Sequence, residues 1–172
     1  MTPVLLGGRT PLRARSFAGW LIFVWLPVVI MLAVIAREST ALFGADNTSR
    51  WLRSGWQLLF GVVDDERWGH IHHIIRKSGH FLGYGMLGLS WLRAFLLLWM
   101  QWMIHRPARV WRGWCVAVAI SCTALVASLD ELHQSFLPNR TGVPQDVVLD
   151  VSGAVALMLI VMTFWVKKDR TR

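Results

Sequence analysis

Three residues near the middle of the sequence would share one face of a helix. Lys77, His80 and Tyr84 are spaced i, i+3 and i+7, which places an ammonium, an imidazole and a phenol in one stripe. Histidine is a common general acid or base because its pKa lies near neutrality, and lysine supplies a point charge for an anion. The stripe is therefore a candidate for acid–base chemistry on an anionic group.

Two later stretches carry polar residues at similar spacing. The shared faces hold Ser128, Glu131 and Gln134 in "SLDELHQSFLPNR", and Asp146, Asp150 and Gly153 in "PQDVVLDVSG". By the same argument Asp130 and His133 point away from the Glu131 face and serve as a helix cap. Arg140 follows on the loop, where its guanidinium offers a forked donor for phosphate or carboxylate.

The elements that must position these residues are membrane helices. The 172-residue chain is 55% hydrophobic and only 16% charged, whereas soluble domains are nearer a quarter charged. Its 11 Trp suit a membrane–water interface. Segments approaching the length of a membrane span are Phe17–Ala36, Gly79–Met103, Val110–Leu129 and Val147–Val166. We therefore expect an all-α integral membrane bundle of four transmembrane helices.

The long connection between the first and second spans, called the outer loop below, is expected to hold one further helix. In "WLRSGWQLLFGVV", Trp56, Leu59, Phe60 and Val63 fall at helical spacing, but the run is too short to span, which favours an interfacial or re-entrant helix. "DDER" after it predicts a solvated turn, and "HIHH" a solvated histidine cluster. The expected divisions are a basic leader (1–16), the first span (17–36), the outer loop (37–76), a three-helix core (77–166) and a basic tail (167–172).

Basic residues indicate how the bundle is oriented. They gather before the first span, between the second and third, and after the fourth: Arg9, Arg13, Arg15, Arg106, Arg109, Arg112, Lys167, Lys168, Arg170 and Arg172. Because positive residues collect on the cytoplasmic side, both termini are predicted to be cytoplasmic. The basic charge is thus a topology signal, and no nucleic-acid partner is expected.

This topology brings the three polar stretches to one membrane level, at the outer face. Ionisable groups there normally face the bundle interior or a wet cavity and pair with one another. Gly79 and Gly83 form a G-x-x-x-G step, which predicts a close helix approach, as does Gly153. Arg93, within the second span, is expected to snorkel or pair.

The motifs "KSGHFLGYGMLG" and "SLDELHQSFLPNRTGVPQDVVLDVSG" resemble the VanZ-like family of small bacterial membrane proteins, named for a protein associated with teicoplanin resistance. The family pattern is K-x-x-H-x-x-x-[YF], then E-x-x-Q-x(4–6)-R, then an Asp, an Asn four residues on, and a Gly. The matching residues, over about 70–166, are Lys77, His80, Tyr84, Glu131, Gln134, Arg140, Asp146 and Gly153. Asp150 departs from the pattern, since it stands where the family has Asn.

These observations predict a site for an anionic lipid headgroup or a lipid-linked envelope precursor. His80, Glu131 and Asp146 are the candidate catalytic residues of a hydrolase or transferase. The expected substrate-binding residues are Lys77, Tyr84, Gln134, Arg140 and Asp150. A cation site made of His80, Glu131 and Asp146 is disfavoured by the two nearby cations, so no metal is predicted. The cofactor and the oligomeric state stay open, and the alternative is a non-enzymatic protein whose polar cluster fixes helix packing.

Overall fold

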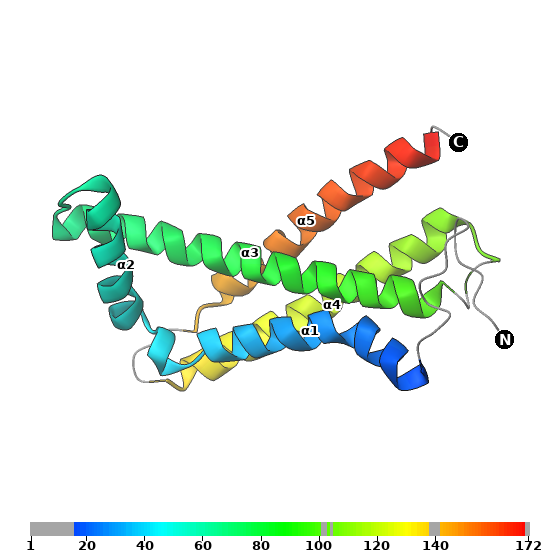
Figure 1. Cartoon of the computed structure of the whole chain (residues 1–172), viewed down its shortest axis with the longest axis horizontal. Coiled ribbons are helices and arrows are strands. Elements are labelled where there is room, and N and C mark those ends of the chain that lie inside the picture. Colours follow the sequence, from blue (N-terminus) through cyan, green and yellow to red (C-terminus); the bar gives the residue numbers. More distant parts are fainter. Residues whose placement is uncertain (1–15, 101–102, 104, 138–141, 171–172) are drawn as a thin grey trace.

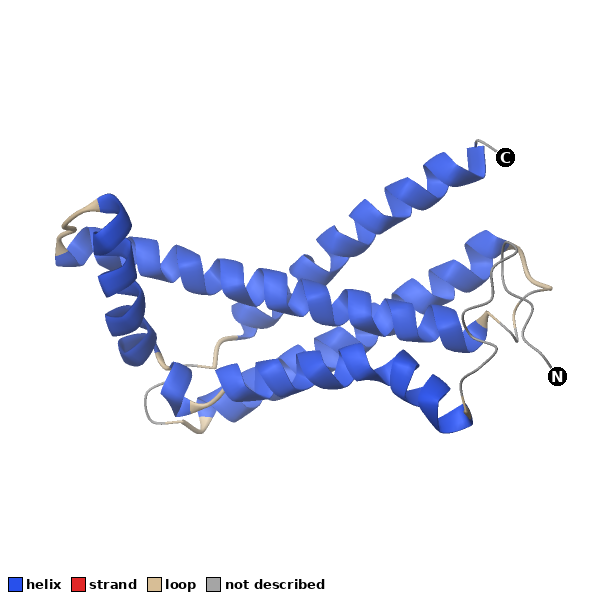
Figure 2. Cartoon of the chain, in the orientation of Figure 1, coloured by secondary structure: helices blue, strands red, loops and turns tan. Residues whose placement is uncertain are grey.

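The computed structural model describes residues 16–100, 103, 105–137 and 142–170, with side chains up to Phe164 in the last helix. Helices form all the regular secondary structure of these residues (Figure 2). They are α1 (Phe17–Glu38), a 3₁₀ turn (Ala41–Phe43), α2 (Ala45–Phe60), α3 (Asp65–Trp99), α4 (Ala108–Ser135) and α5 (Pro144–Arg170).

Four of these helices are long and apolar enough to cross a membrane. The candidate spans are Phe17–Glu38, Asp65–Trp99, Ala108–Ser135 and Pro144–Phe164. This confirms the predicted all-α architecture with four long apolar helices and a short extra helix, α2, between the first two. The position of α2 at the membrane interface stays a prediction.

The long helix α3 lies at the centre of the bundle, packed against α1, α4 and α5 (Figure 1). Successive long helices run in opposite directions, so α1 begins and α5 ends at the same end (Figure 1). We call the other end, where α1 and α4 end and α5 begins, the polar end. It holds all three polar stretches found in the sequence.

The start of α3 differs from the prediction. The helix begins at Asp65 rather than near residue 77, because Asp64 caps it: its Oδ1 accepts a hydrogen bond of 2.8 Å from the backbone N–H of Arg67. Asp65 and Glu66 in the first turn also suit the positive end of the helix dipole. The expected solvated turn is thus a cap followed by the first turn of a helix.

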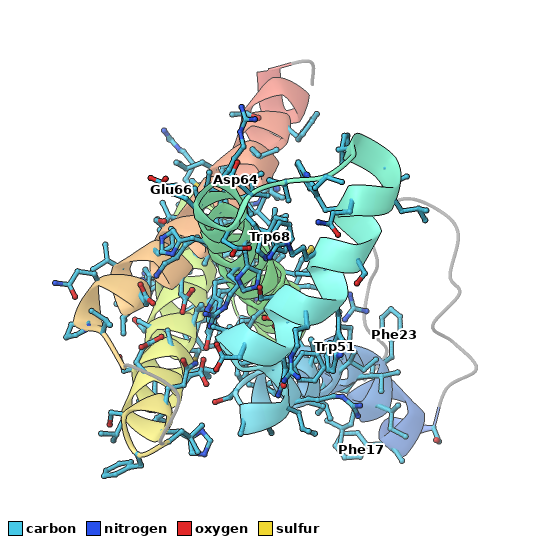
Figure 3. The ribbon with its side chains drawn as sticks, turned by 90° about the vertical axis from the view of Figure 1, so that its left-hand side faces the viewer. Phe17, Phe23, Trp51, Asp64, Glu66 and Trp68 are labelled. Carbon is cyan, nitrogen blue, oxygen red and sulfur yellow. The ribbon has the colours of Figure 1, made fainter. Side chains whose placement is uncertain are left out.

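The extra helix α2 packs across this extension of α3 (Figure 3). Trp68 Nε1 donates to Ser49 Oγ at 2.7 Å, and Arg53 pairs with Asp65 at 2.6 Å. His72 is buried, stacked on Trp68 and 3.1 Å from the hydroxyl of Thr48, so the prediction that the whole histidine cluster is solvated was wrong for His72. Several large apolar side chains of α2 are exposed: Trp51, Leu58, Leu59 and Phe60.

Small residues let α3 and α5 touch, but not the pair predicted. A Cβ on Gly153 would lie 2.0 Å from the carbonyl oxygen of Phe81, so only glycine permits this crossing. Gly85 and Gly88 face α5 in the same way. Gly79 and Gly83 would place a Cβ with no other atom within 4 Å, so the predicted close approach at these two positions was wrong.

The half of the bundle away from the polar end is packed with apolar side chains. Leu92, Cys115, Ala119, Ala154 and Met158 form a buried cluster there. Aromatic rings surround it, with Trp25 meeting Trp91 edge to face at a centroid distance of 5.8 Å.

Arg93, in this half, donates hydrogen bonds to α1, which bends in its first part (Figure 1). Pro27 has no N–H, so the carbonyl of Phe23 loses its helical partner. Arg93 Nη1 donates to the carbonyls of Phe23 and Val24, at 3.0 and 3.2 Å, while the guanidinium lies 4.3 Å from the centre of the Phe23 ring. The expected pairing of Arg93 is therefore with backbone carbonyls and an aromatic face.

Candidate functional site

One ion pair and one imidazole–carboxylate contact join α3 to α5 at the polar end. Lys77 forms an ion pair with Asp146 in the first turn of α5, and both side chains are partly exposed. One turn further along each helix, His80 Nδ1 lies 3.4 Å from Asp150 Oδ1. Because 77/80 and 146/150 are each one turn apart, the second pair lies deeper in the bundle than the first.

Asp150 is the most buried polar residue of this group, with no exposed surface. Within the described residues, neither of its carboxylate oxygens has a hydrogen-bond partner, so the imidazole of His80 is its nearest ionic neighbour there. A buried carboxylate left in this state is costly, so its place here calls for an explanation beyond packing.

Tyr84 completes the α3 stripe and turns towards α4. Its hydroxyl donates to Asp130 Oδ2 at 2.8 Å, and Gln134 Nε2 donates to the same oxygen at 2.9 Å. The rings of His80 and Tyr84 stack with centroids 6.2 Å apart. The three predicted residues of α3 therefore do face inward, where they reach two different partner helices.

Asp130 is the residue that the sequence reasoning placed wrongly. It was expected to be a cap, yet it is partly buried and holds the hydrogen bonds of Tyr84 and Gln134. Ser128 was expected to face inward, but it is exposed and donates to the carbonyl of Ala124 in its own helix. The i, i+4 relation of Asp130 to Gln134 was the signal available, because residues so spaced are neighbours on a helix.

Glu131 is buried as predicted, but its contact is with the chain between α4 and α5. Its Oε2 accepts a hydrogen bond of 2.8 Å from the backbone N–H of Val143. Gly142 lies so close to α4 that a Cβ would come 2.2 Å from the carbonyl oxygen of Glu131. Glu131 thus anchors the start of α5. Arg140, predicted to bind substrate, lies outside the described residues.

The first span also contributes to the polar end, which the sequence reasoning did not foresee. Ser39, at the end of α1, lies 2.9 Å from Nδ1 of His133 on α4. A cavity of about 10 Å³, close to the room needed for one water molecule, lies beside it. Ser39, His80, Tyr84 and Asp130 are among its lining residues, so α1, α3 and α4 all meet there.

The polar cluster brings together groups that can exchange protons. Among the described residues, His, Cys, Asp and Glu side chains form no group of three able to hold a metal ion. What the described part offers instead is an imidazole beside a buried carboxylate, with a phenol and an ammonium on the same helix face. Such a set can orient, accept and return a proton.

The sequence pattern of the VanZ/LLP1 family matches residues 17–165. The chain belongs to the VanZ/LLP1 family. The match includes α1 and α2, so the kinship extends beyond the region of about 70–166 in which the motifs are recognisable.

No characterised protein and no solved structure gives a significant match to this chain. Membership in the VanZ/LLP1 family therefore establishes a membrane protein of this kind and names no substrate or reaction.

Proposed function

We propose that the polar end of this VanZ/LLP1 protein binds an anionic lipid headgroup, or the phosphate of a lipid-linked envelope precursor, and performs acid–base chemistry on it. The observation that carries the proposal is the His80–Asp150 pair, a 3.4 Å imidazole–carboxylate contact with the carboxylate fully buried. A carboxylate beside one ring nitrogen orients a histidine and stabilises its charged form, which prepares the other nitrogen for proton transfer.

In a hydrolysis, His80 Nε2 takes a proton from a water molecule as the water oxygen attacks phosphorus. The bond from phosphorus to the leaving oxygen breaks, and the imidazolium returns the proton to that oxygen. Lys77, at the more exposed position, attracts the phosphate and offsets its charge. Asp150 acts through His80 and is a positioning residue. Arg140 is proposed as a second anion-binding group.

The second candidate function is structural, and the Tyr84–Asp130–Gln134 bonds favour it. These three side chains satisfy one another between α3 and α4. Polar bonds between membrane helices stabilise packing without any substrate. On this reading the polar end holds the bundle together and serves a partner protein.

The deciding experiment measures release of phosphate or headgroup from lipid phosphates by the purified protein in vesicles. His80→Gln should abolish turnover, and Lys77→Ala should mainly raise KM. Asp150→Asn removes the carboxylate beside His80, so it should lower kcat and change the pH profile of kcat. The family pattern has Asn at this position, so the variant should still fold. Ser128→Ala, an exposed change on α4, is the control.

Equal turnover in all four variants would refute the catalytic role. Loss of His80→Gln and Lys77→Ala from the membrane, with Ser128→Ala retained, would support the structural candidate. Teicoplanin susceptibility of cells carrying these variants is the phenotype to score beside turnover.

The proposal places the polar end outside the cell, as the distribution of basic residues predicts. Ser135 and Ala108 are exposed residues at opposite ends of α4. In a background without Cys115 and Cys122, a membrane-impermeant thiol reagent applied to whole cells should label Ser135→Cys and spare Ala108→Cys. The reverse labelling pattern would mean that the polar end faces the cytoplasm.

A further inference from the structure

A groove of about 470 Å³ runs along the side of the bundle, beside the Lys77–Asp146 pair. Its polar lining comes from His73, Lys77 and Ser78 of α3. Its apolar lining comes from Ile74, Phe81 and Leu82 of α3 and from Leu149 of α5. A volume of this size lies within the range of pockets that bind small molecules.

The lining changes character along the helix axis. The polar lining residues His73, Lys77 and Ser78 lie towards the polar end, together with the apolar Ile74. The lining residues of α3 deeper in the bundle, Phe81 and Leu82, are both apolar. At a rise of 1.5 Å per residue, the stretch from His73 to Leu82 covers about 14 Å. The groove therefore has the polarity of an amphiphile, with the head at the polar end and the chain pointing into the bilayer.

The groove is open on its outer side. Ile74 is 63% exposed and Leu82 is 55% exposed, on a helix long and apolar enough to span a membrane. Its wall on the α5 side stays close because Gly153 meets the carbonyl of Phe81, which keeps α5 against α3 at this level. A molecule already in the bilayer could enter sideways, without leaving the membrane.

We propose that this groove seats one hydrocarbon chain of an anionic membrane lipid whose phosphate lies at Lys77. The inference rests on the proposed function, since it names the substrate class and the route by which it reaches His80. Lys77 belongs to both regions: its ammonium pairs with Asp146, and the residue is part of the groove lining. Charge and polarity thus favour a phospholipid or prenyl phosphate over an uncharged lipid.

The test uses the purified protein in nanodiscs of equal parts phosphatidylcholine and phosphatidylglycerol, with retained lipids counted by native mass spectrometry. We expect one phosphatidylglycerol per protein. Leu82→Trp fills the groove and should reduce that retention about tenfold, the effect of losing about 1.4 kcal/mol. Met86→Trp is the matched control, because Met86 is on the same helix, one turn on, 50% exposed and outside the groove.

Lys77→Gln should still retain one lipid but without the preference for phosphatidylglycerol. In the wild type, glycerol 3-phosphate should not displace the bound phosphatidylglycerol, because it has no hydrocarbon chain. The proposal that the groove binds lipid would be overturned if Leu82→Trp retained as much lipid as the wild type. It would also be overturned if Met86→Trp lost as much lipid as Leu82→Trp.

Failure of the chemistry is distinguishable from failure of the groove. His80→Gln and Asp150→Asn should retain lipid whether or not the protein is an enzyme. A protein without turnover that still loses lipid only in Leu82→Trp would keep the groove as a binding site and refute the reaction. Full turnover in Leu82→Trp would be consistent with the proposed reaction but would refute the groove as the route of the substrate to His80.

Discussion

At the polar end, α3 meets α5 through an ion pair and an imidazole–carboxylate contact, whereas further along the same two helices meet through glycine, alanine and a methionine. Lys77 and His80 contact Asp146 and Asp150 in the first region. In the second, Gly88 lies against Ala154 and Met158. Close packing of small apolar residues is one way in which membrane helices associate, and polar contacts between helices are another.

The comparison also concerns how each region treats its polar groups. Arg93, in the apolar half, donates to two carbonyls beside Pro27 and so completes a defect in α1. Asp150, at the polar end, has no hydrogen-bond partner for either oxygen within the described residues. Among the described residues the apolar half also has a buried donor without a partner, the indole N–H of Trp91. What distinguishes Asp150 is that its oxygens belong to a carboxyl group beside an imidazole, which is a pair able to transfer a proton.

The largest effect is expected where the two regions join, at the close contact of α3 and α5. Gly153→Ala adds a Cβ against the Phe81 carbonyl and should cost about 3 kcal/mol, because backbone must move. Gly79→Ala is the same chemical change with no atom within 4 Å, so it should be neutral or slightly stabilising through helix propensity. Reversible unfolding in mixed detergent measures both. Equal loss in the two variants would restore the G-x-x-x-G prediction.

That contact shows how much the sequence could predict. Apolar length predicted four spans, and helical spacing predicted that Lys77, His80 and Tyr84 face inward, because both depend on local composition and period. Which glycine touches a neighbour depends on where two helices cross, which spacing within one helix does not encode. The same holds for Asp130, whose role is set by Tyr84 on another helix.

The start of α3 and the contribution of α1 illustrate a second limit. The acids of "DDER" suit either a solvated turn or a helix N-terminus, and the packing of α2 on Trp68 favours the helix. Ser39 was not considered as a site residue because its partner His133 is far away in the chain.

A smaller effect is expected at Arg93. Arg93→Leu should cost about 2 kcal/mol, since it removes the hydrogen bonds that the guanidinium donates to the carbonyls of Phe23 and Val24 in an apolar setting. Pro27→Ala restores a backbone N–H for the Phe23 carbonyl, so Arg93→Leu should cost much less in this background. A double-mutant cycle by unfolding gives the coupling. Strictly additive effects would mean that Arg93 does not serve the proline defect.

Tyr84→Phe tests a satisfied bond at the polar end and should cost about 1 kcal/mol, because Asp130 keeps Gln134 as a donor. Thr123→Val is the control from deeper in the bundle: its hydroxyl donates to the Ala119 carbonyl of its own helix, so losing this bond should be close to neutral. If Tyr84→Phe also abolished turnover, the phenol would belong to the chemistry rather than to packing.

The smallest effect is expected at Asp64, which lies outside the spans. Its hydrogen bond from the Arg67 N–H holds the pKa of this exposed carboxyl below the ordinary value of 3.8. A lowered folded-state pKa means that the cap stabilises α3 fully above the unfolded pKa and loses this contribution as the pH falls through the folded value. Asp64→Asn keeps a capping oxygen that does not titrate. The melting temperatures of the two proteins should therefore differ little at neutral pH, and the wild type should lose more on acidification to about pH 3. If the melting temperatures of the two proteins fell equally on acidification, the start of α3 would not depend on this carboxylate. The packing of α2 on Trp68 would then determine where the helix starts.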